Sequence, residues 1–198
     1  MTLLPQKQQL ITLGPAASLQ YVPDFINSAT SRSLIEQWTG ELDWVQSEIT
    51  LFGRKVAIPR LNAWYGDQPY SYSGTKFDAK PFTRELRDIQ QKIQDYSGLQ
   101  FNSVLINWYR DGHDSMGWHS DDEASLGVNP QIASISLGER RKFVLREKKD
   151  RTNKHTIMLD GGSLLLMLGE TQTLWQHSLP RTRKPLEYRL NLTFRLVH

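Results

Sequence analysis

Polar and apolar residues alternate without a break from Arg189 to Leu196. Successive side chains of a β-strand point to opposite sides, so this alternation predicts a strand with one buried, apolar face. The other face carries four polar residues: Arg189, Asn191, Thr193 and Arg195. The strand therefore presents two arginines on the same side.

Strand patterns fill most of the chain after Gly98. Gly, Pro and Asp, which favour turns, separate segments at 103–110, 117–121, 131–137, 141–147, 154–159, 163–168 and 173–178. The last strand extends over 187–197. Eight strands of this kind predict two facing antiparallel sheets, a double-stranded β-helix or jelly roll, with its core at 103–197.

The first half of the chain contains the predicted helices. Residues 1–23 show no clear period, and we expect an irregular N-terminal arm there. A first helix is expected from Ser31 to Trp38, and a second begins after Thr83 and ends at Gly98. Between them, Ile49 to Ile58 predicts a β-hairpin. The fold class is mainly β with flanking helices, in a single domain over 24–198.

Length and composition narrow the class of protein. The 198 residues are enough for one domain with its own core, and the absence of cysteine excludes disulfides and cysteine-bound metals. The longest apolar run, Leu164 to Leu168, is too short to span a membrane, and the N-terminus lacks the pattern of a secretion signal. We expect an intracellular monomer without a membrane partner, cytoplasmic or, in a eukaryote, nuclear.

Basic residues gather in three clusters, at 140–142, 146–151 and 181–184, in a chain of net charge +3. Such clusters neutralise phosphates and favour a nucleic-acid partner. A run of charge is also the ordinary character of a solvated face, and both interpretations stay open at this point.

The run WHSDDE contains a histidine and an aspartate two residues apart, His119 and Asp121. In a strand these side chains point to the same side and can hold one ion. With His177 from another strand they would form the two-histidine, one-carboxylate set of non-haem Fe(II) oxygenases, which leaves positions open for a co-substrate and dioxygen. A histidine–aspartate pair also arises often by chance, and most histidines are surface or core residues.

The polar face of the last strand suits a small dianion such as 2-oxoglutarate, because a guanidinium forms two parallel hydrogen bonds to a carboxylate. Asn107 and Tyr109 share a face of an earlier strand and could donate hydrogen bonds to the same molecule. The alternatives are an amphipathic strand with a charged outer face, and an asparagine at a strand end beside a core tyrosine.

Several motifs occur in a fixed order: NWYRDGHDSMGWHSDDE at 107–123, IASISLG at 132–138, LWQHSLP, and RLNLTFR at 189–195. Together they resemble the AlkB family of Fe(II)/2-oxoglutarate dioxygenases. Upstream, PRLNAWYGDQPYSYSG at 59–74 resembles the nucleotide-recognition segment of the vertebrate AlkB homologues that repair DNA. The resemblance covers about residues 50 to 197 and implies a nucleotide-recognition extension at 50–75, on the N-terminal side of the jelly roll.

The resemblance implies roles for the metal-binding residues and for one end of the co-substrate. His119, Asp121 and His177 would bind Fe(II) and form the catalytic centre. Arg189 would pair with the distal carboxylate of 2-oxoglutarate, with help from Tyr109.

At the other end of the co-substrate, Arg195 would lie near the carboxylate next to the keto group, helped by Asn191 and Asn107. Thr193 lies on the same predicted strand face and would line the same site.

The implied activity is oxidative demethylation of N-alkylated bases such as 1-methyladenine and 3-methylcytosine in DNA, with RNA as a further substrate. It consumes O2 and releases formaldehyde, succinate and CO2. Tyr70 and Tyr72 would contact the flipped base. Glu123 would favour a positively charged methylated base, although its sequence context alone predicts a solvated loop acid.

Phe52 lies at the tip of the predicted hairpin, where a duplex-acting AlkB homologue carries an intercalating phenylalanine. A phenylalanine tucked under the turn is an equal alternative. Arg54, Lys55 and Arg60 lie close enough in the sequence to contact phosphates.

Two other functions remain as alternatives. An Fe(II)/2-oxoglutarate hydroxylase that acts on a tRNA or a protein would keep the chemistry and change the substrate. A non-catalytic jelly roll that binds nucleic acid or a small acid is disfavoured, because the three metal ligands and both arginines are present.

Overall fold

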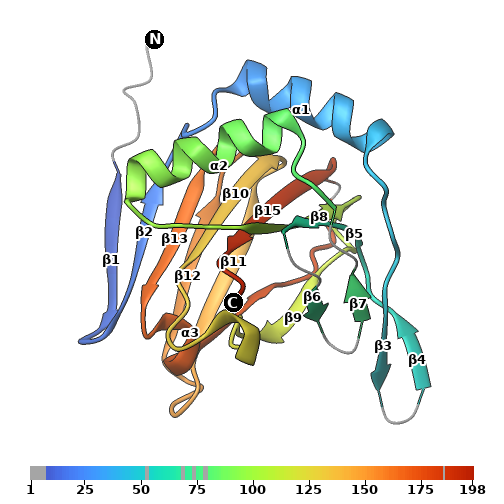
Figure 1. The fold of residues 1–198 in the computed structure, drawn as a ribbon. Helices are drawn as coiled ribbons and strands as arrows, with labels where there is room; N and C mark the ends of the chain where they lie inside the picture. The colour runs from blue at the N-terminus through green and yellow to red at the C-terminus, as the bar shows by residue number, and fades with distance from the viewer. Residues whose placement is uncertain (1–7, 52–53, 68–69, 73–74, 78–79, 185) are drawn as a thin grey trace.

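The structure, a computed structural model, describes residues 8–51, 54–67, 70–72, 75–77, 80–184 and 186–198. Its larger antiparallel sheet has seven strands in the order β1-β2-β13-β10-β15-β8-β5 (Figure 1). In that order the strands span Gln9–Gly14, Ala17–Val22, Leu164–Gly169, Ile132–Gly138, Arg189–Arg195, Ser103–Tyr109 and Leu61–Gly66. The last strand in the sequence therefore lies inside the sheet, between β10 and β8.

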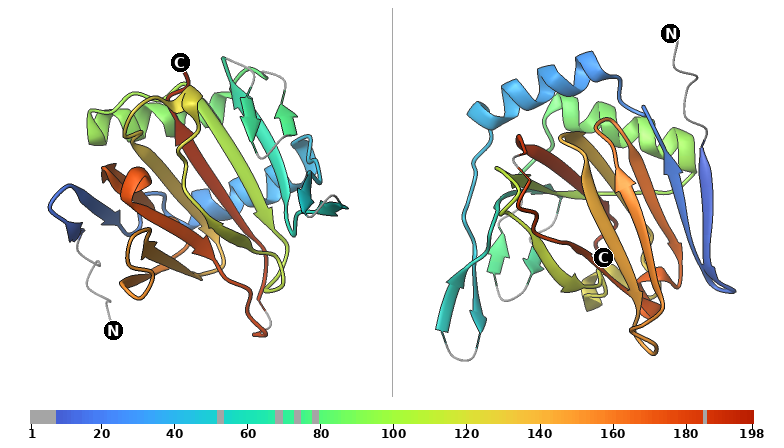
Figure 2. Two further views of the ribbon diagram at one scale, coloured as in Figure 1. Left: turned by 90° about the horizontal axis from the view of Figure 1, so that it is seen from below. Right: turned by 180° about the vertical axis from the view of Figure 1, so that it is seen from behind.

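The smaller sheet has four strands in the order β12-β11-β14-β9, which span Lys154–Leu159, Arg141–Glu147, Trp175–Leu179 and Met116–His119. It packs against the larger sheet, as the two views of Figure 2 show. The predicted jelly roll is confirmed. Its predicted strand at 173–178 begins later than expected, because the four residues Thr171–Leu174 form the short helix α3.

Two hairpins complete the described strands. β3 (Glu48–Leu51) pairs with β4 (Arg54–Ala57), as the pattern at 49–58 predicted, and β6 (Tyr70–Tyr72) pairs with β7 (Thr75–Phe77). Figures 1 and 2 show both hairpins on the β9 side of the fold, away from β1.

Two helices, α1 (Ser28–Glu41) and α2 (Arg84–Ser97), cover the outer face of the larger sheet (Figure 1). Helix α2 has the predicted ends: the Thr83 side chain accepts a hydrogen bond from the Leu86 N–H, and Gly98 closes the helix at φ 72°, a left-handed conformation that favours glycine. Helix α1 is longer than the predicted 31–38. Among the described residues, no helix combines the length and the apolar character needed to cross a bilayer.

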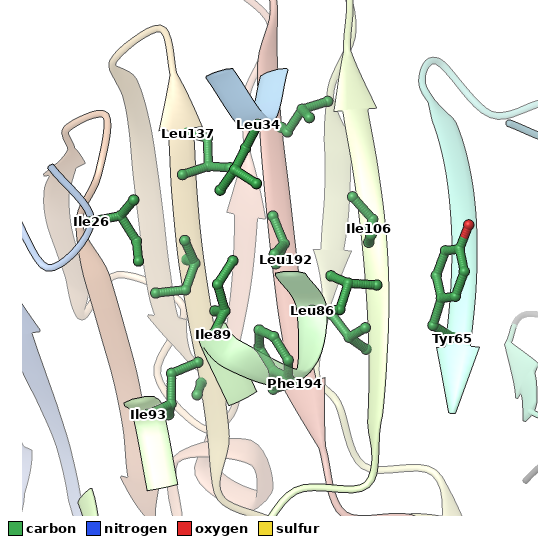
Figure 3. Close-up of a cluster of buried hydrophobic side chains, with 14 of the residues drawn as sticks. Ile26, Leu34, Tyr65, Leu86, Ile89, Ile93, Ile106, Leu137, Leu192 and Phe194 are labelled. Carbon is green, nitrogen blue, oxygen red and sulfur yellow. The ribbon is translucent and has the colours of Figure 1, made fainter. Parts of the chain in front are cut away.

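The two faces of the larger sheet bury different kinds of side chain. Toward the helices, strand residues such as Ile106, Leu192 and Phe194 pack against Leu86 and Ile89 of α2 (Figure 3). Toward the smaller sheet, a second apolar cluster shares the space with polar side chains; its members include Leu19, Phe143, Leu145, Leu165 and Met167. The two sheets therefore enclose a partly polar interior.

The expected irregular arm at 1–23 is wrong for the residues that the structure describes. Strands β1 and β2 form a hairpin that joins the larger sheet through the pairing of β2 with β13. In β2, Ala17, Leu19 and Tyr21 are buried and alternate with more exposed residues. An alternation with only three buried residues is too short to stand out from sequence alone, and pairing with the neighbouring strand β13 stabilises β2.

Every residue of β15 is buried, on both faces. Its polar face lies between the two sheets and not in solvent, which rules out the alternative of an amphipathic strand with a charged outer face. The two arginines on this face, Arg189 and Arg195, are 1% and 2% exposed. Buried guanidinium groups need acceptors, so their surroundings define the candidate site.

Candidate metal and co-substrate site

Three potential metal ligands meet where β9 and β14 pair. His119 ends β9 and lies opposite His177 of β14 in the register, with 4.2 Å between their ring centroids. Asp121 follows two residues after His119. The ligand atoms of His119, Asp121 and His177 lie within 4.8 Å of one another. The structure brings the three predicted residues together, although β9 ends at His119 and does not extend to residue 121 as predicted.

The charges of this group suit a divalent cation. Asp121 Oδ1 accepts a hydrogen bond from Arg195 Nη2 at 2.5 Å, and its Oδ2 lies 3.7 Å from His177 Nε2. Burial alone would raise the pKa of Asp121, but the charges of Arg195 and the two histidines lower it to about 2. Burial lowers the pKa of His177 to about 3 and also lowers that of His119. At neutral pH the group is one carboxylate and two neutral imidazoles, the protonation state that binds metal.

These shifts predict how the stability of the metal-free protein depends on pH. Unfolded His177 takes up a proton near pH 6.5, whereas the folded protein does so only near pH 3. Between these values the unfolded state binds more protons, so the free energy of unfolding falls as the pH falls. Protonation of Asp121 lowers the free energy of unfolding further between pH 3.8 and about 2.

Thermal unfolding of metal-free protein from pH 7 to pH 4 measures this dependence. His177→Gln should flatten the decline, and His113→Gln, a change at an exposed histidine, is the control. Equal slopes for wild type and His177→Gln would contradict the prediction.

The same cavity is lined by the polar faces of β15 and β8. Arg189 pairs with Tyr109 in the register, and Asn191 with Asn107. The cavity is bounded by the three metal-ligand candidates and by all six residues predicted to bind the co-substrate: Asn107, Tyr109, Arg189, Asn191, Thr193 and Arg195. Met116, Phe143, Leu159, Met167 and Leu179 form its apolar wall.

Arg189 provides a direct test of whether this cavity suits an anion. Its Nη2 donates to Ser136 Oγ at 2.8 Å, and its guanidinium lies 5.3 Å from the centre of the Tyr109 ring. Its Nε and Nη1 are buried and have no hydrogen-bond partner among the described residues. Burial lowers the pKa of Arg189 to about 10, so it is still charged at neutral pH. A carboxylate at this position would supply the missing acceptors.

The two asparagines differ in what they can offer a ligand. Arg60 Nε donates to Asn107 Oδ1 at 2.8 Å, which leaves the amide N–H groups of Asn107 for the cavity. Asn191 Nδ2 already donates to Ser134 Oγ at 2.8 Å and to the Ile135 carbonyl at 2.9 Å. Asn107 can therefore donate to a carboxylate, whereas the amide N–H groups of Asn191 already bond to β10, and Asn191 lines the cavity without a free donor.

One predicted substrate contact needs correction, and a second lies outside the predicted strand. Arg60 is 3% exposed and donates to Asn107 and to the Ser115 carbonyl, so it forms part of the wall of the site and does not reach phosphates as predicted. Glu123 lies beyond the end of β9 and directly precedes a one-turn 3₁₀ helix, Ala124–Leu126. Glu123 is half-buried and does not line the described cavity.

The remaining substrate predictions concern the hairpins. Tyr70 and Tyr72 belong to β6, but their side chains lie outside what the structure describes, as does Phe52 entirely. Arg54 and Lys55 are exposed on β4.

The basic clusters are only partly available to a ligand. Arg141 is 2% exposed and donates to the carbonyls of Asp111, Asp114 and Pro180, so it holds the fold together. Arg140 pairs with Asp160 at 2.7 Å. Arg146 stacks on the exposed Trp118, with 4.1 Å from its guanidinium carbon to the ring centre. Partners from distant segments decide which of these charges face solvent, and a sequence run does not reveal them.

Ser134 and Ser136, which orient Asn191 and Arg189, were not among the predicted site residues. The sequence does contain a pattern that points to them, because these serines interrupt the otherwise apolar run of β10 at alternate positions. Phe143, whose ring centre lies 5.3 Å from that of His177, offered no such signal.

Residues 18–195 match the model of the 2OG-Fe(II) oxygenase superfamily, and the chain therefore belongs to this superfamily. The curated relatives narrow the assignment from this superfamily to the AlkB family. "Alpha-ketoglutarate-dependent dioxygenase alkB homolog 3" of Homo sapiens is 40% identical over 185 residues, 89% of this chain and 65% of that protein. "DNA oxidative demethylase ALKBH2" of Mus musculus is 38% identical over 172 residues, 82% of this chain and 70% of that protein.

The chain thus spans slightly less than two thirds of the length of the human homologue. Among solved structures, that of OsALKBH1 superposes with a TM-score of 0.63 at 19% identity, covering 95% of this chain and 100% of the other. This likeness supports the fold.

Proposed function

We propose that this protein removes methyl groups from N-alkylated bases of nucleic acid, with Fe(II), O2 and 2-oxoglutarate. The observation that carries the proposal is one cavity that holds both the three ligand candidates and the buried, incompletely bonded Arg189. When bound, Fe(II) activates dioxygen with 2-oxoglutarate as reductant, which yields succinate and CO2, and the hydroxylated methyl group leaves as formaldehyde.

The residues of the chain have separate roles in this proposal. His119, Asp121 and His177 hold the iron, with Asp121 kept ionised by Arg195. Arg189 anchors the distal carboxylate of 2-oxoglutarate beside Tyr109, and Asn107 donates toward the other end. The apolar wall and the low exposure of these groups limit water around the reacting centre, which strengthens each charge interaction.

A methylated base in DNA, with RNA as a further candidate, is the proposed substrate. The support is the resemblance of residues 59–74 to a nucleotide-recognition segment and the name of the mouse relative, a DNA oxidative demethylase. In this proposal Tyr70 and Tyr72 contact the flipped base. The hairpins on the β9 side of the fold approach the nucleic-acid strand that carries this base. We also propose that the protein acts inside the cell, where the proposed nucleic-acid substrate lies, and that it does so as a monomer.

Succinate release tests the proposal. Purified protein with Fe(II), ascorbate and 2-oxoglutarate is assayed with single- and double-stranded DNA and RNA oligomers that carry 1-methyladenine or 3-methylcytosine. The expected result is release of succinate and formaldehyde that depends on the methylated base, with unmethylated oligomers as controls. Stimulation by peptides or tRNA alone would indicate the alternative hydroxylase, and metal binding without turnover would contradict an enzymatic role.

A separate prediction concerns strand preference. If Phe52 fills the gap left by a flipped base, Phe52→Ala should reduce turnover of double-stranded substrate by about 5- to 150-fold, because base–aromatic stacking contributes about 1–3 kcal/mol, and it should spare single-stranded substrate. The ratio of kcat/KM for the two strand forms measures this. Equal losses of kcat/KM on double- and single-stranded substrates would refute the intercalation of Phe52.

A further inference from the structure

Gln172 is fully buried behind the metal site, and the proposed function gives it no role. It lies in α3, directly before the strand that carries His177. Its Oε1 accepts a hydrogen bond from the backbone N–H of Asp121 at 2.9 Å. Its Nε2 donates to Met167 Sδ on β13 at 3.4 Å. The side chain thus connects the larger sheet to the loop that bears the aspartate.

Two neighbouring contacts join the same segments. Ser120 Oγ donates to the Trp175 carbonyl at 2.9 Å. Lys148 Nζ donates both to Asp122 Oδ2 and to the Gln172 carbonyl, each at 2.9 Å. Residues 120–122 are therefore each connected to residues 172–175, and through them to β14.

This connection matters because β9 ends at His119. Beyond that point the strand ladder no longer fixes the backbone, yet Asp121 must hold its carboxylate beside two histidines. Its backbone N–H is donated to a side chain and not to a neighbouring strand. A buried N–H that loses its acceptor is costly, so the loop would shift to recover a partner. Such a shift would move the aspartate away from the histidines.

We propose that Gln172 is a positioning residue that fixes the backbone of Asp121 for metal binding and couples it to the strand of His177. This inference rests on the proposed role of Asp121 as an iron ligand. Outer-shell partners of this kind typically change metal affinity by about 10–100-fold.

The test measures the Kd for Mn(II), a redox-stable substitute for Fe(II), by electron paramagnetic resonance on the full chain without nucleic acid. Gln172→Leu keeps a side chain of similar length and removes the acceptor, so the Kd should rise about 10–100-fold. At saturating Fe(II), kcat should return to near the wild-type value, because Gln172 does not touch the reacting atoms. Thr173→Val is the matched control: it removes a hydrogen bond of the same short helix, to Asn129, and should leave the Kd unchanged.

A Kd for Gln172→Leu within twofold of wild type would overturn the inference. If Gln172→Leu does not fold, Gln172→Met decides, because it also keeps the length of the side chain and removes the accepting oxygen, so its Kd should rise about 10–100-fold; a Kd within twofold of wild type in that folded variant would overturn the inference. Asp121→Ala separates the two proposals. Wild-type Mn(II) affinity in Asp121→Ala would refute the iron site itself, whereas its loss together with normal binding by Gln172→Leu would refute the role of Gln172 alone.

Discussion

Asp121→Asn should abolish measurable turnover. The amide is close in shape to the carboxylate, but it removes the anionic ligand that neutralises part of the charge of the metal. It also places N–H groups where Arg195 Nη2 now donates. We expect an affinity for Mn(II) at least 100-fold lower, because the variant loses a directly coordinating group and not merely an outer-shell partner.

Asp122→Asn is a close control. Asp122 is the next residue, is exposed, and pairs with Lys148 at 2.9 Å. Exposed pairs contribute about 1 kcal/mol or less, so turnover should stay within about twofold of wild type. Circular dichroism and thermal unfolding of both metal-free variants show whether they fold. Asp121→Asn should unfold at lower temperature, since removal of one partner of a buried ion pair costs about 3–5 kcal/mol. Wild-type turnover by Asp121→Asn would refute the metal site.

Arg189→Met should raise the 2-oxoglutarate requirement by about 100-fold or more without destabilising the metal-free protein. Hydrogen bonds to charged groups contribute about 1.5–3 kcal/mol each, so two lost bonds to a carboxylate amount to at least two factors of ten. In the protein without co-substrate the effect on stability has the opposite sign, because Arg189 is a buried charge whose Nε and Nη1 have no hydrogen-bond partner among the described residues. An apolar side chain of similar length should there be neutral or stabilising.

Two measurements separate these effects. The Kd for 2-oxoglutarate is determined without oxygen in the presence of Mn(II), and thermal unfolding is followed with and without 2-oxoglutarate. Wild type should gain stability from 2-oxoglutarate, and Arg189→Met should gain little at the same concentration. Arg140→Met, a change at an exposed arginine paired with Asp160, is the control. An unchanged requirement would show that the distal carboxylate binds elsewhere.

Local patterns predicted the parts of this molecule that depend on local geometry. Alternation placed Arg189 and Arg195 on one face of a strand. Helix α2 follows from its cap at Thr83 and its end at Gly98. These two features depend on residues a few positions apart, whose relative directions are fixed by the backbone alone. The spacing of His119 and Asp121 predicted the right grouping, but Asp121 lies beyond the end of β9 and is held by a distant side chain.

The errors concern partners that lie far apart in the sequence. Arg60 looked like a phosphate contact because it is basic and near a hairpin, yet Asn107 and the Ser115 carbonyl hold it inside. Arg141 belonged to a basic run and is buried among three carbonyls. Whether a charged side chain faces solvent is decided by the acceptors that the fold brings to it, and no local pattern reports them.

The central position of β15 in the larger sheet has a consequence for biosynthesis. Its neighbours β8 and β10 leave the ribosome well before it, and they cannot pair with each other across the gap that β15 fills. Until residues 189–195 emerge, the nascent chain holds an interrupted sheet with two exposed strand edges, which are prone to pairing with other chains. Protection by chaperones during synthesis would therefore matter more for this sheet than for one in which the last strand to be synthesised lies at an edge.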